Sequence, residues 1–167
     1  MSGVGVRDAR GDDAGAMALI FREGIEDRVA TFETRLPSEE ARAEALRSEG
    51  PVLVAELDGE VAGWAKVAPY DPVHDYYATV GEATIYVSRA QRGGGIGAAL
   101  VEALGDAAEE AGFHKLVGKV FTTNAASIAL FERHGWDQVG VHRRHGRLDG
   151  EWKDVLVVEK LLGDAAE

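Results

Sequence analysis

The chain has 167 residues, the size of one ordinary domain, so we expect a single domain over residues 1–167. Its 46% hydrophobic and 28% charged residues exclude a disordered protein. A formal net charge of −11 disfavours nucleic-acid binding, and the absence of cysteine excludes disulfides, thiolate metal sites and a cysteine nucleophile. The first ten residues lack the apolar core of a signal peptide, and no stretch has the roughly 20 apolar residues of a membrane span. We therefore expect a cytoplasmic protein with no membrane partner.

The first half of the chain predicts two helices followed by a hairpin. Apolar residues recur at helical spacing after Gly11, and a second, mostly charged helix is expected from Pro37-Ser38 to Gly50-Pro51. Two β-branched strands over residues 52–57 and 61–68 follow. They are joined by Asp58-Gly59, a dipeptide that tolerates positive φ in a tight turn.

The second half predicts strands and helices in alternation. A strand over residues 81–87 places Glu82, Thr84 and Tyr86 on one face and Ala83, Ile85 and Val87 on the other. The next predicted elements are a helix over residues 96–111, a strand over 116–121, a short helix over 124–134 and strands over 136–142 and 152–162. The mixture predicts an α/β or α+β fold.

A glycine-rich loop lies between the strand that ends at Val87 and the long helix that follows. Residues 91–98 are Gln-Arg-Gly-Gly-Gly-Ile-Gly-Ala, so backbone amides can converge at a helix N-terminus, a place that suits phosphate. No Lys-Ser or Lys-Thr pair follows the glycines, and their spacing does not match a dinucleotide fold. The alternative interpretation is a flexible connection, and the flanking strand and helix favour a different phosphate-bearing cofactor.

Two motifs in this half resemble the GNAT family of N-acetyltransferases. Arg92 to Gly97 is similar to the family's acyl-CoA pyrophosphate signature, and Asn124, Ser127, Phe131, Gly135 and Trp136 are similar to its later helix. The stretches 31–33, 82–88 and 150–155 resemble one branch, the phosphinothricin, methionine sulfoximine and arsinothricin acetyltransferases. The resemblance implies a mixed, mostly antiparallel central sheet flanked by helices.

The resemblance also implies a reaction. The chain would move an acetyl group from acetyl-CoA, directly within a ternary complex, to the α-amine of a small amino acid or a toxic glutamate analogue. It would need no metal and would form a homodimer. Alternatives are an acetyltransferase for another small amine or for a protein N-terminus, and a non-catalytic acyl-CoA-binding module. The last remains open because Phe131 stands where relatives carry Tyr or His and cannot donate a proton.

Roles for individual residues follow from the same resemblance. Glu82 would be the general base, because an alkyl amine with a pKa near 10 must lose a proton before transfer. Tyr86 is a candidate proton donor to the departing thiolate, with His134 as its alternative, and the backbone near Val87 would polarise the thioester. The cofactor-binding residues would be Val87, Arg92, Gly93, Gly94, Gly95, Ile96, Gly97, Ala98, Asn124, Ser127 and Phe131. Structural alternatives are a solvent-facing carboxylate for Glu82 and a helix cap for Asn124.

The acceptor site would use Phe32, Glu33, His74 and Tyr77, with His74 standing where relatives carry an Arg. The basic run from His142 to Arg147 would hold an anionic group of the acceptor, form a subunit contact or be a solvated hairpin arm. Because His142 and His145 are an odd number apart, a regular strand would place them on opposite faces, which argues against a shared metal.

Overall fold

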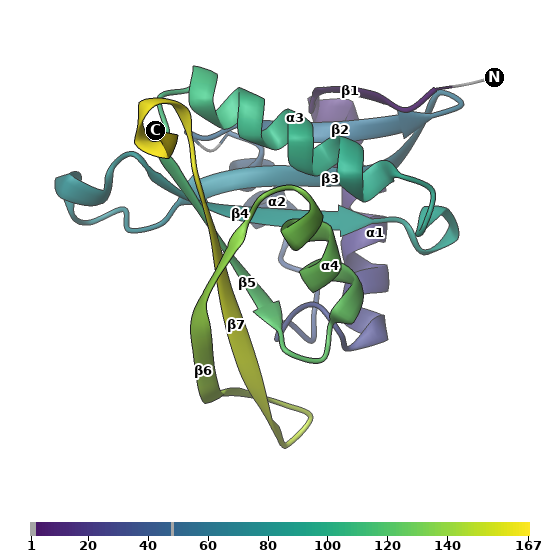
Figure 1. Ribbon diagram of the computed structural model, residues 1–167. Coiled ribbons are helices and arrows are strands. Elements are labelled where there is room, and N and C mark those ends of the chain that lie inside the picture. The colour runs from purple at the N-terminus through teal and green to yellow at the C-terminus, as the bar shows by residue number, and fades with distance from the viewer. Residues whose placement is uncertain (1–2, 48) are drawn as a thin grey trace.

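The computed structural model describes residues 3–47 and 49–167, and these form one seven-stranded sheet with helices on both faces (Figure 1). The strand order is β1-β2-β3-β4-β5-β7-β6, and every neighbouring pair is antiparallel except β4 and β5. The strands are β1 (Gly5–Asp8), β2 (Val52–Leu57), β3 (Glu60–Pro69), β4 (Val80–Val87), β5 (Lys115–Phe121), β6 (Asp137–Leu148) and β7 (Glu151–Leu161). The expected mixed, mostly antiparallel sheet is confirmed.

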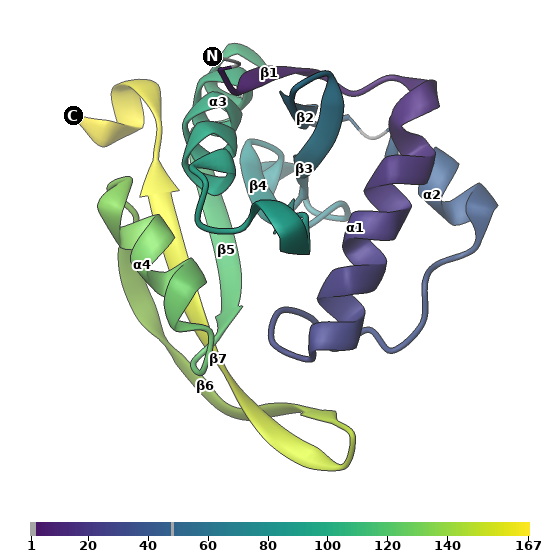
Figure 2. The ribbon, with the colours of Figure 1, turned by 90° about the vertical axis from the view of Figure 1, so that its right-hand side faces the viewer.

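Four α-helices cover the two faces of this sheet (Figure 2). They are α1 (Ala14–Asp27), α2 (Glu39–Ala45), α3 (Ile96–Glu110) and α4 (Ala125–Arg133). α3 and α4 cover one face, where the main core contains Leu100, Leu104, Leu116 and Val158. α1 and α2 cover the other face over β2 to β4, with a smaller core around Met17 and Trp64. Among the described residues, no helix combines the length and apolar character needed to cross a membrane.

Most of the predicted elements are present, and the turn between β2 and β3 is confirmed in detail. Asp58 and Gly59 have φ values of 55° and 82°, as a tight hairpin of this kind requires. The helix predicted to reach Gly50 ends at Ala45, and α2 buries none of its residues; residue 48 lies outside the described residues. The strand predicted to end at His142 continues, as β6, to Leu148.

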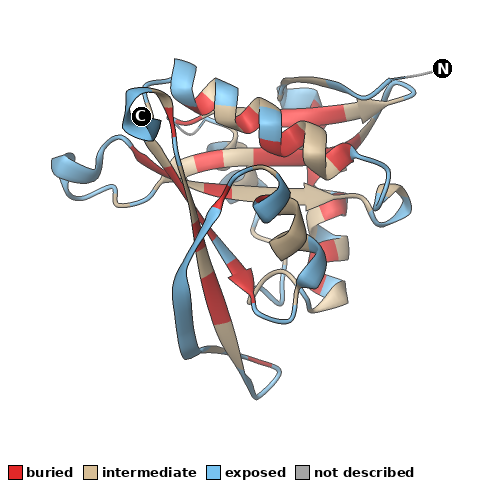
Figure 3. Cartoon of the chain, in the orientation of Figure 1, coloured by how far each residue is buried: buried red, intermediate tan, exposed pale blue. Residues whose placement is uncertain are grey.

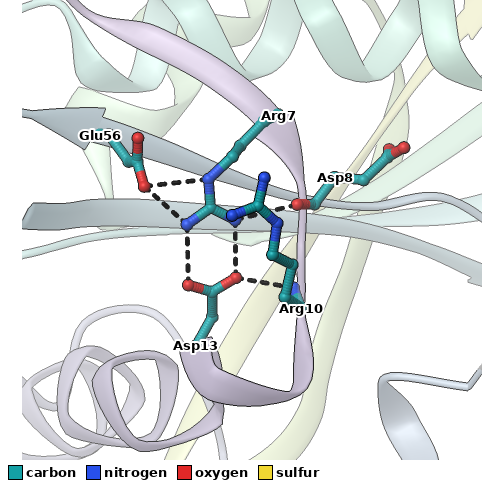
Figure 4. A network of polar contacts seen from close by, with 5 residues as sticks. All are labelled: Arg7, Asp8, Arg10, Asp13 and Glu56. Carbon is teal, nitrogen blue, oxygen red and sulfur yellow. Dashed lines mark hydrogen bonds and ion pairs between the residues drawn. The ribbon is translucent and has the colours of Figure 1, made fainter. Parts of the chain in front are cut away.

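The first strand, β1, was not predicted from the sequence. It has four residues, too few for a period-2 pattern, and it is held by pairing with β2 and by the side chain of Arg7. The Arg7 guanidinium lies between two carboxylates (Figure 4). Nη1 and Nη2 donate to Asp13 at 2.8 and 2.9 Å, and Nη2 donates to Glu56 at 2.6 Å. Asp13 is buried and also accepts the Arg10 backbone N–H at 2.7 Å, so this network ties β1, β2 and the start of α1 together.

Replacement of Asp13 by Asn is expected to lower the free energy of unfolding by about 1 to 2 kcal/mol at pH 7, because charge-assisted hydrogen bonds to a buried carboxylate are lost. The Arg7 side chain lowers the pKa of Asp13 below the usual aspartate value. A lowered folded-state pKa stabilises the fold above the ordinary aspartate pKa, and this contribution is lost as pH falls through the lowered value. Urea unfolding of both proteins from pH 7 to pH 2 should show the difference shrinking with acid. A pH-independent difference would contradict this account.

Candidate active site

β4 and β5 separate halfway along their length (Figure 1). Their parallel ladder ends at the pair Glu82 and Val117, and the two strands then diverge. On the β3 side of β4, the Val80 C=O accepts a backbone hydrogen bond of 3.1 Å and the Ser88 N–H donates one of 2.8 Å. Because backbone groups alternate along a strand, the N–H groups of Ile85 and Val87 point into the gap between β4 and β5. This gap therefore offers backbone donors that no neighbouring strand uses.

The glycine-rich loop follows β4 and leads into α3 at one end of this gap. Gly93 and Gly95 have φ values of 80° and 87°, in the left-handed region that favours glycine. Gly95 is the N-cap of α3 and, within the described residues, no side chain caps the first turn. Ile96, 1% exposed, anchors that turn in the core. The first amides of α3 thus remain open at the positive end of the helix dipole, which fits a diphosphate.

α4 packs beside the same loop. A Cβ at Gly97 would lie 3.1 Å from Leu130, so the glycine lets α4 approach the first turn of α3. Asn124 caps α4 by accepting the Ser127 N–H at 3.2 Å, which confirms the cap interpretation of this residue. Phe131 is buried, with its ring 4.7 Å from that of Trp136. The ring of Phe131 also lies against Gly118 of β5, so it closes the α4 side of the gap.

Glu82 lies where the β4–β5 ladder ends and faces the side of the sheet covered by α1. Its Oε2 accepts a hydrogen bond from Lys119 Nζ at 3.3 Å, and about one third of its side chain is exposed. A strand carboxylate that is open to solvent and lies beside the gap can accept a proton from a bound amine.

Tyr86 lies two residues further along the same face of β4. Its ring packs on Phe21 and Trp64, with ring centroids 5.0 and 5.1 Å apart. Burial raises the pKa of Tyr86, although a hydrogen bond with the Thr31 side chain acts in the opposite direction. The phenol therefore keeps its proton at neutral pH, and it bonds to the segment that follows α1.

The predicted acceptor residues are only partly brought together. Phe32 packs on Phe121, with ring centroids 4.7 Å apart, and reaches this position because Gly146 has no Cβ to clash with the ring. Glu33 is exposed, and its N–H donates to Thr31 Oγ1 at 3.1 Å. Both residues lie on the Glu82 side of the sheet.

A cavity of about 450 Å³ lies on the same side, and Tyr77 lines it. Its other lining residues are Tyr70, Val80, Lys115, Val117, Lys119, Val139, Gly140, Val141, His142, Val157 and Glu159. Along β5 the cavity extends as far as Lys119, and Phe32 packs on Phe121, two residues further on. The Glu82–Lys119 pair therefore lies between the cavity and Phe32. His74 does not line the cavity. Its Nδ1 bonds to Asp71 at 2.8 Å and its ring stacks on Tyr76.

Lys119 was missed in the sequence, although one signal pointed to it. Lys119 is an exposed residue within the otherwise apolar strand β5, and its neighbours Gly118 and Val120 are buried. A lysine inside an apolar strand indicates a position that is open or functional, because burying an unpaired charge is costly.

The prediction that His142 and His145 face opposite sides is wrong. β6 has an irregular register between His142 and Gly146, and Arg144 within it has a φ of 48°. The two imidazole rings therefore stack, with centroids 4.4 Å apart. A prediction from residue spacing assumes a regular strand, and a bulge can bring residues an odd number apart onto the same face. Within residues 3–47 and 49–167, no group of three or more His, Cys, Asp or Glu side chains is arranged to hold a metal.

Comparison with known proteins places this chain in a family. Residues 19–136 match the acetyltransferase (GNAT) family model. An L-methionine sulfoximine/L-methionine sulfone acetyltransferase of Pseudomonas paraeruginosa is 31% identical over 159 residues, 92% of each chain. A phosphinothricin N-acetyltransferase of Streptomyces viridochromogenes is 34% identical over 155 residues, 91% of this chain and 84% of that protein. The structure of a phosphinothricin acetyltransferase from Sinorhizobium meliloti in complex with acetyl-CoA has a TM-score of 0.90 and 29% identity, covering 97% of this chain and 90% of that one.

The chain belongs to the acetyltransferase (GNAT) family. Within the family it falls in the phosphinothricin acetyltransferase-like branch, and it is an acetyl-CoA-dependent N-acetyltransferase.

Proposed function

We propose that this enzyme acetylates the α-amine of a small amino acid or glutamate analogue, including toxic analogues of the methionine sulfoximine, phosphinothricin or arsinothricin type. The similarity to relatives named for the first two substrates, over more than nine tenths of the chain, carries this proposal. A carboxylate at the end of the β4–β5 ladder, near a cavity with room for an amino acid, supports it. Acetylation of a toxic analogue would make a cell that carries the enzyme resistant to it.

Within this group we expect methionine sulfoximine to be preferred over phosphinothricin. The family resemblance implies an Arg in relatives where this chain has His74, and the imidazole of His74 is already bonded to Asp71. A half-exposed histidine paired with a carboxylate offers a weaker anchor for a phosphinate than a free guanidinium does.

The proposed chemistry uses three groups along β4. Glu82 takes a proton from the ammonium group of the acceptor, so that its nitrogen can bond to the acetyl carbon. The Val87 N–H, which points into the gap, is placed to donate to the carbonyl oxygen of the acetyl group. As the C–S bond breaks, Tyr86 is the candidate for giving a proton to the sulfur, and the nitrogen supplies the replacement proton when it loses its second proton to become an amide. Because a thiolate leaves readily near neutral pH, this last step contributes least.

Acetyl-CoA supplies the acetyl group as a thioester, and the open amides of Gly93 and of residues 95–97 suit its diphosphate. Val87, Arg92 and Ala98 flank these amides at the same end of the gap, and Asn124, Ser127 and Phe131 would line the pantetheine side from α4. The chain has no cysteine, which agrees with direct transfer within a ternary complex.

A homodimer is part of the proposal. β6 is the edge strand of the sheet and is exposed along most of its length (Figure 3). Val139 and Val141 of β6 and Tyr70 and Tyr77 line the cavity while more than 40% exposed. An exposed apolar surface of this kind is typical of an interface.

A screen of amine acceptors with acetyl-CoA, monitored by release of the free thiol, tests the proposed function. We expect turnover with methionine sulfoximine and methionine sulfone, less with phosphinothricin, and little with peptides that have free N-termini. Preferred turnover of a peptide would favour an acceptor at a protein N-terminus. Binding of acetyl-CoA without turnover of any amine would favour the acyl-CoA-binding module.

A further inference from the structure

The C-terminal end of α1 carries an unusual concentration of acidic residues. Glu23, Glu26 and Asp27 lie in its last two turns, and the last turn has no basic residue. The C-terminus of a helix is the negative end of its dipole, so carboxylates there are unfavourable unless cations offset them. Two arginines do so: Arg89, which precedes the glycine-rich loop, and Arg92, which lies within it.

Arg89 and Arg92 both bind the carboxylate of Asp27. Arg89 Nη2 lies 2.8 Å from Asp27 Oδ1, and Arg92 Nη1 lies 2.6 Å from Asp27 Oδ2. The Asp27 side chain is 22% exposed, less than the side chains of Arg89 at 49% and Arg92 at 42%. The two arginines lower its pKa, so the carboxylate stays ionised over the working range of pH.

Arg92 is held at a second point. Its Nε donates to the Val87 carbonyl at 3.4 Å, so the guanidinium spans the end of β4 and the end of α1. The Arg89 backbone N–H donates to Glu23 Oε2 at 2.7 Å, which fixes the short turn Arg89–Gln91 to the same helix. The chain that leads into Gly93 is therefore braced on both sides.

We propose that Asp27 is a positioning residue for the cofactor diphosphate, acting through Arg92 and Arg89 to hold the glycine-rich loop in its binding conformation. This inference rests on the proposed use of residues 93–97 to bind acetyl-CoA. Arg92 is a brace of the loop, and the backbone amides provide the direct contacts to phosphate. A loop ordered before binding loses less conformational entropy when the cofactor arrives.

The test compares Asp27→Asn with a matched control, Asp149→Asn. Asp149, in the turn between β6 and β7, pairs at 2.9 Å with Arg28, the residue that follows Asp27 in the chain. The two variants make the same chemical change in neighbouring ion pairs. Two acetyl donors separate the roles: acetyl-CoA, which carries the diphosphate, and S-acetylpantetheine, which does not.

For Asp27→Asn we expect the Kd for CoA and the KM for acetyl-CoA to rise about tenfold, since charge-assisted hydrogen bonds are lost. The value of kcat/KM for S-acetylpantetheine should stay within about twofold, because that donor makes no use of the loop. Asp149→Asn should leave kcat/KM for both donors unchanged. Arg89→Gln, which removes one arginine and leaves the Arg92–Asp27 pair in place, should weaken CoA binding in the same direction by a smaller factor.

Unchanged or tighter binding of CoA by Asp27→Asn would overturn the positioning role while leaving the proposed function intact, provided that the wild type binds CoA. An equal loss of kcat/KM with acetyl-CoA and with S-acetylpantetheine would also overturn the positioning role, because Asp27 would then act on the fold as a whole. If Asp27→Asn does not fold, Arg89→Gln decides by the same criteria. Failure of the wild type to bind CoA would overturn both proposals.

Discussion

Replacement of Glu82 by Gln is expected to lower kcat by about two orders of magnitude, the usual contribution of a positioned general base. The amide keeps the shape of the side chain but cannot accept the ammonium proton. The residual rate should then rise roughly tenfold per pH unit below the pKa of the amine, since only amine that is already neutral reacts. Steady-state kinetics from pH 6 to pH 9 measure both effects.

Two controls make this result specific. The Kd of the Glu82→Gln variant for CoA should equal that of the wild type, because Glu82 lies on the opposite side of the sheet from α3. Glu56→Gln removes another strand carboxylate that pairs with a cation, at a distant part of the sheet, and should leave kcat unchanged. Unchanged turnover in Glu82→Gln would remove this residue from the mechanism.

Replacement of Gly95 by Val is expected to raise the Kd for CoA by about tenfold to a hundredfold. Gly95 has a φ of 87° at the N-cap of α3, and a β-branched residue in the left-handed region costs roughly 1 to 2 kcal/mol or more. The loop would relax away from this conformation, and the first amides of α3 would no longer converge. Titration calorimetry with CoA measures the effect.

Gly105 provides the matched control within the same helix. A Cβ at Gly105 meets no atom within 4 Å, and its φ is not in the left-handed region. Gly105→Ala should therefore leave the Kd for CoA unchanged and stabilise the fold by about 0.5 to 1 kcal/mol. Equal affinities in Gly95→Val and the wild type would show that the left-handed glycine is not needed for binding.

The sequence predicted most of the fold because local signals agreed with the tertiary structure. The Asp58-Gly59 turn and the apolar stripe of α3 are complete within short windows of the chain. β1 escaped prediction because four residues carry no pattern. The bulge in β6 escaped it because the left-handed conformation at Arg144 accompanies a hydrogen bond from its N–H to Asp154, ten residues away.

The residues of the candidate site also fall into two groups, those that local motifs predict and those that depend on distant partners. The glycine-rich loop and Glu82 belong to contiguous motifs, so the sequence alone was enough to predict them as site residues. Lys119 and Asp27 act through partners that are 37 and at least 62 residues away in the chain. His74 was placed in the acceptor site by resemblance, whereas the structure shows its imidazole bonded to Asp71. No local pattern encodes such pairings, and only the folded chain reveals them.

Backbone NMR of the wild type, titrated with CoA and separately with pantetheine, tests the account most directly. With CoA, we predict that the largest amide shifts will fall on residues 93–97, with a smaller shift at Val87. Pantetheine lacks the diphosphate and should leave residues 93–97 nearly unchanged. If CoA bound without moving these amides, or did not bind at all, the proposed cofactor site would be wrong.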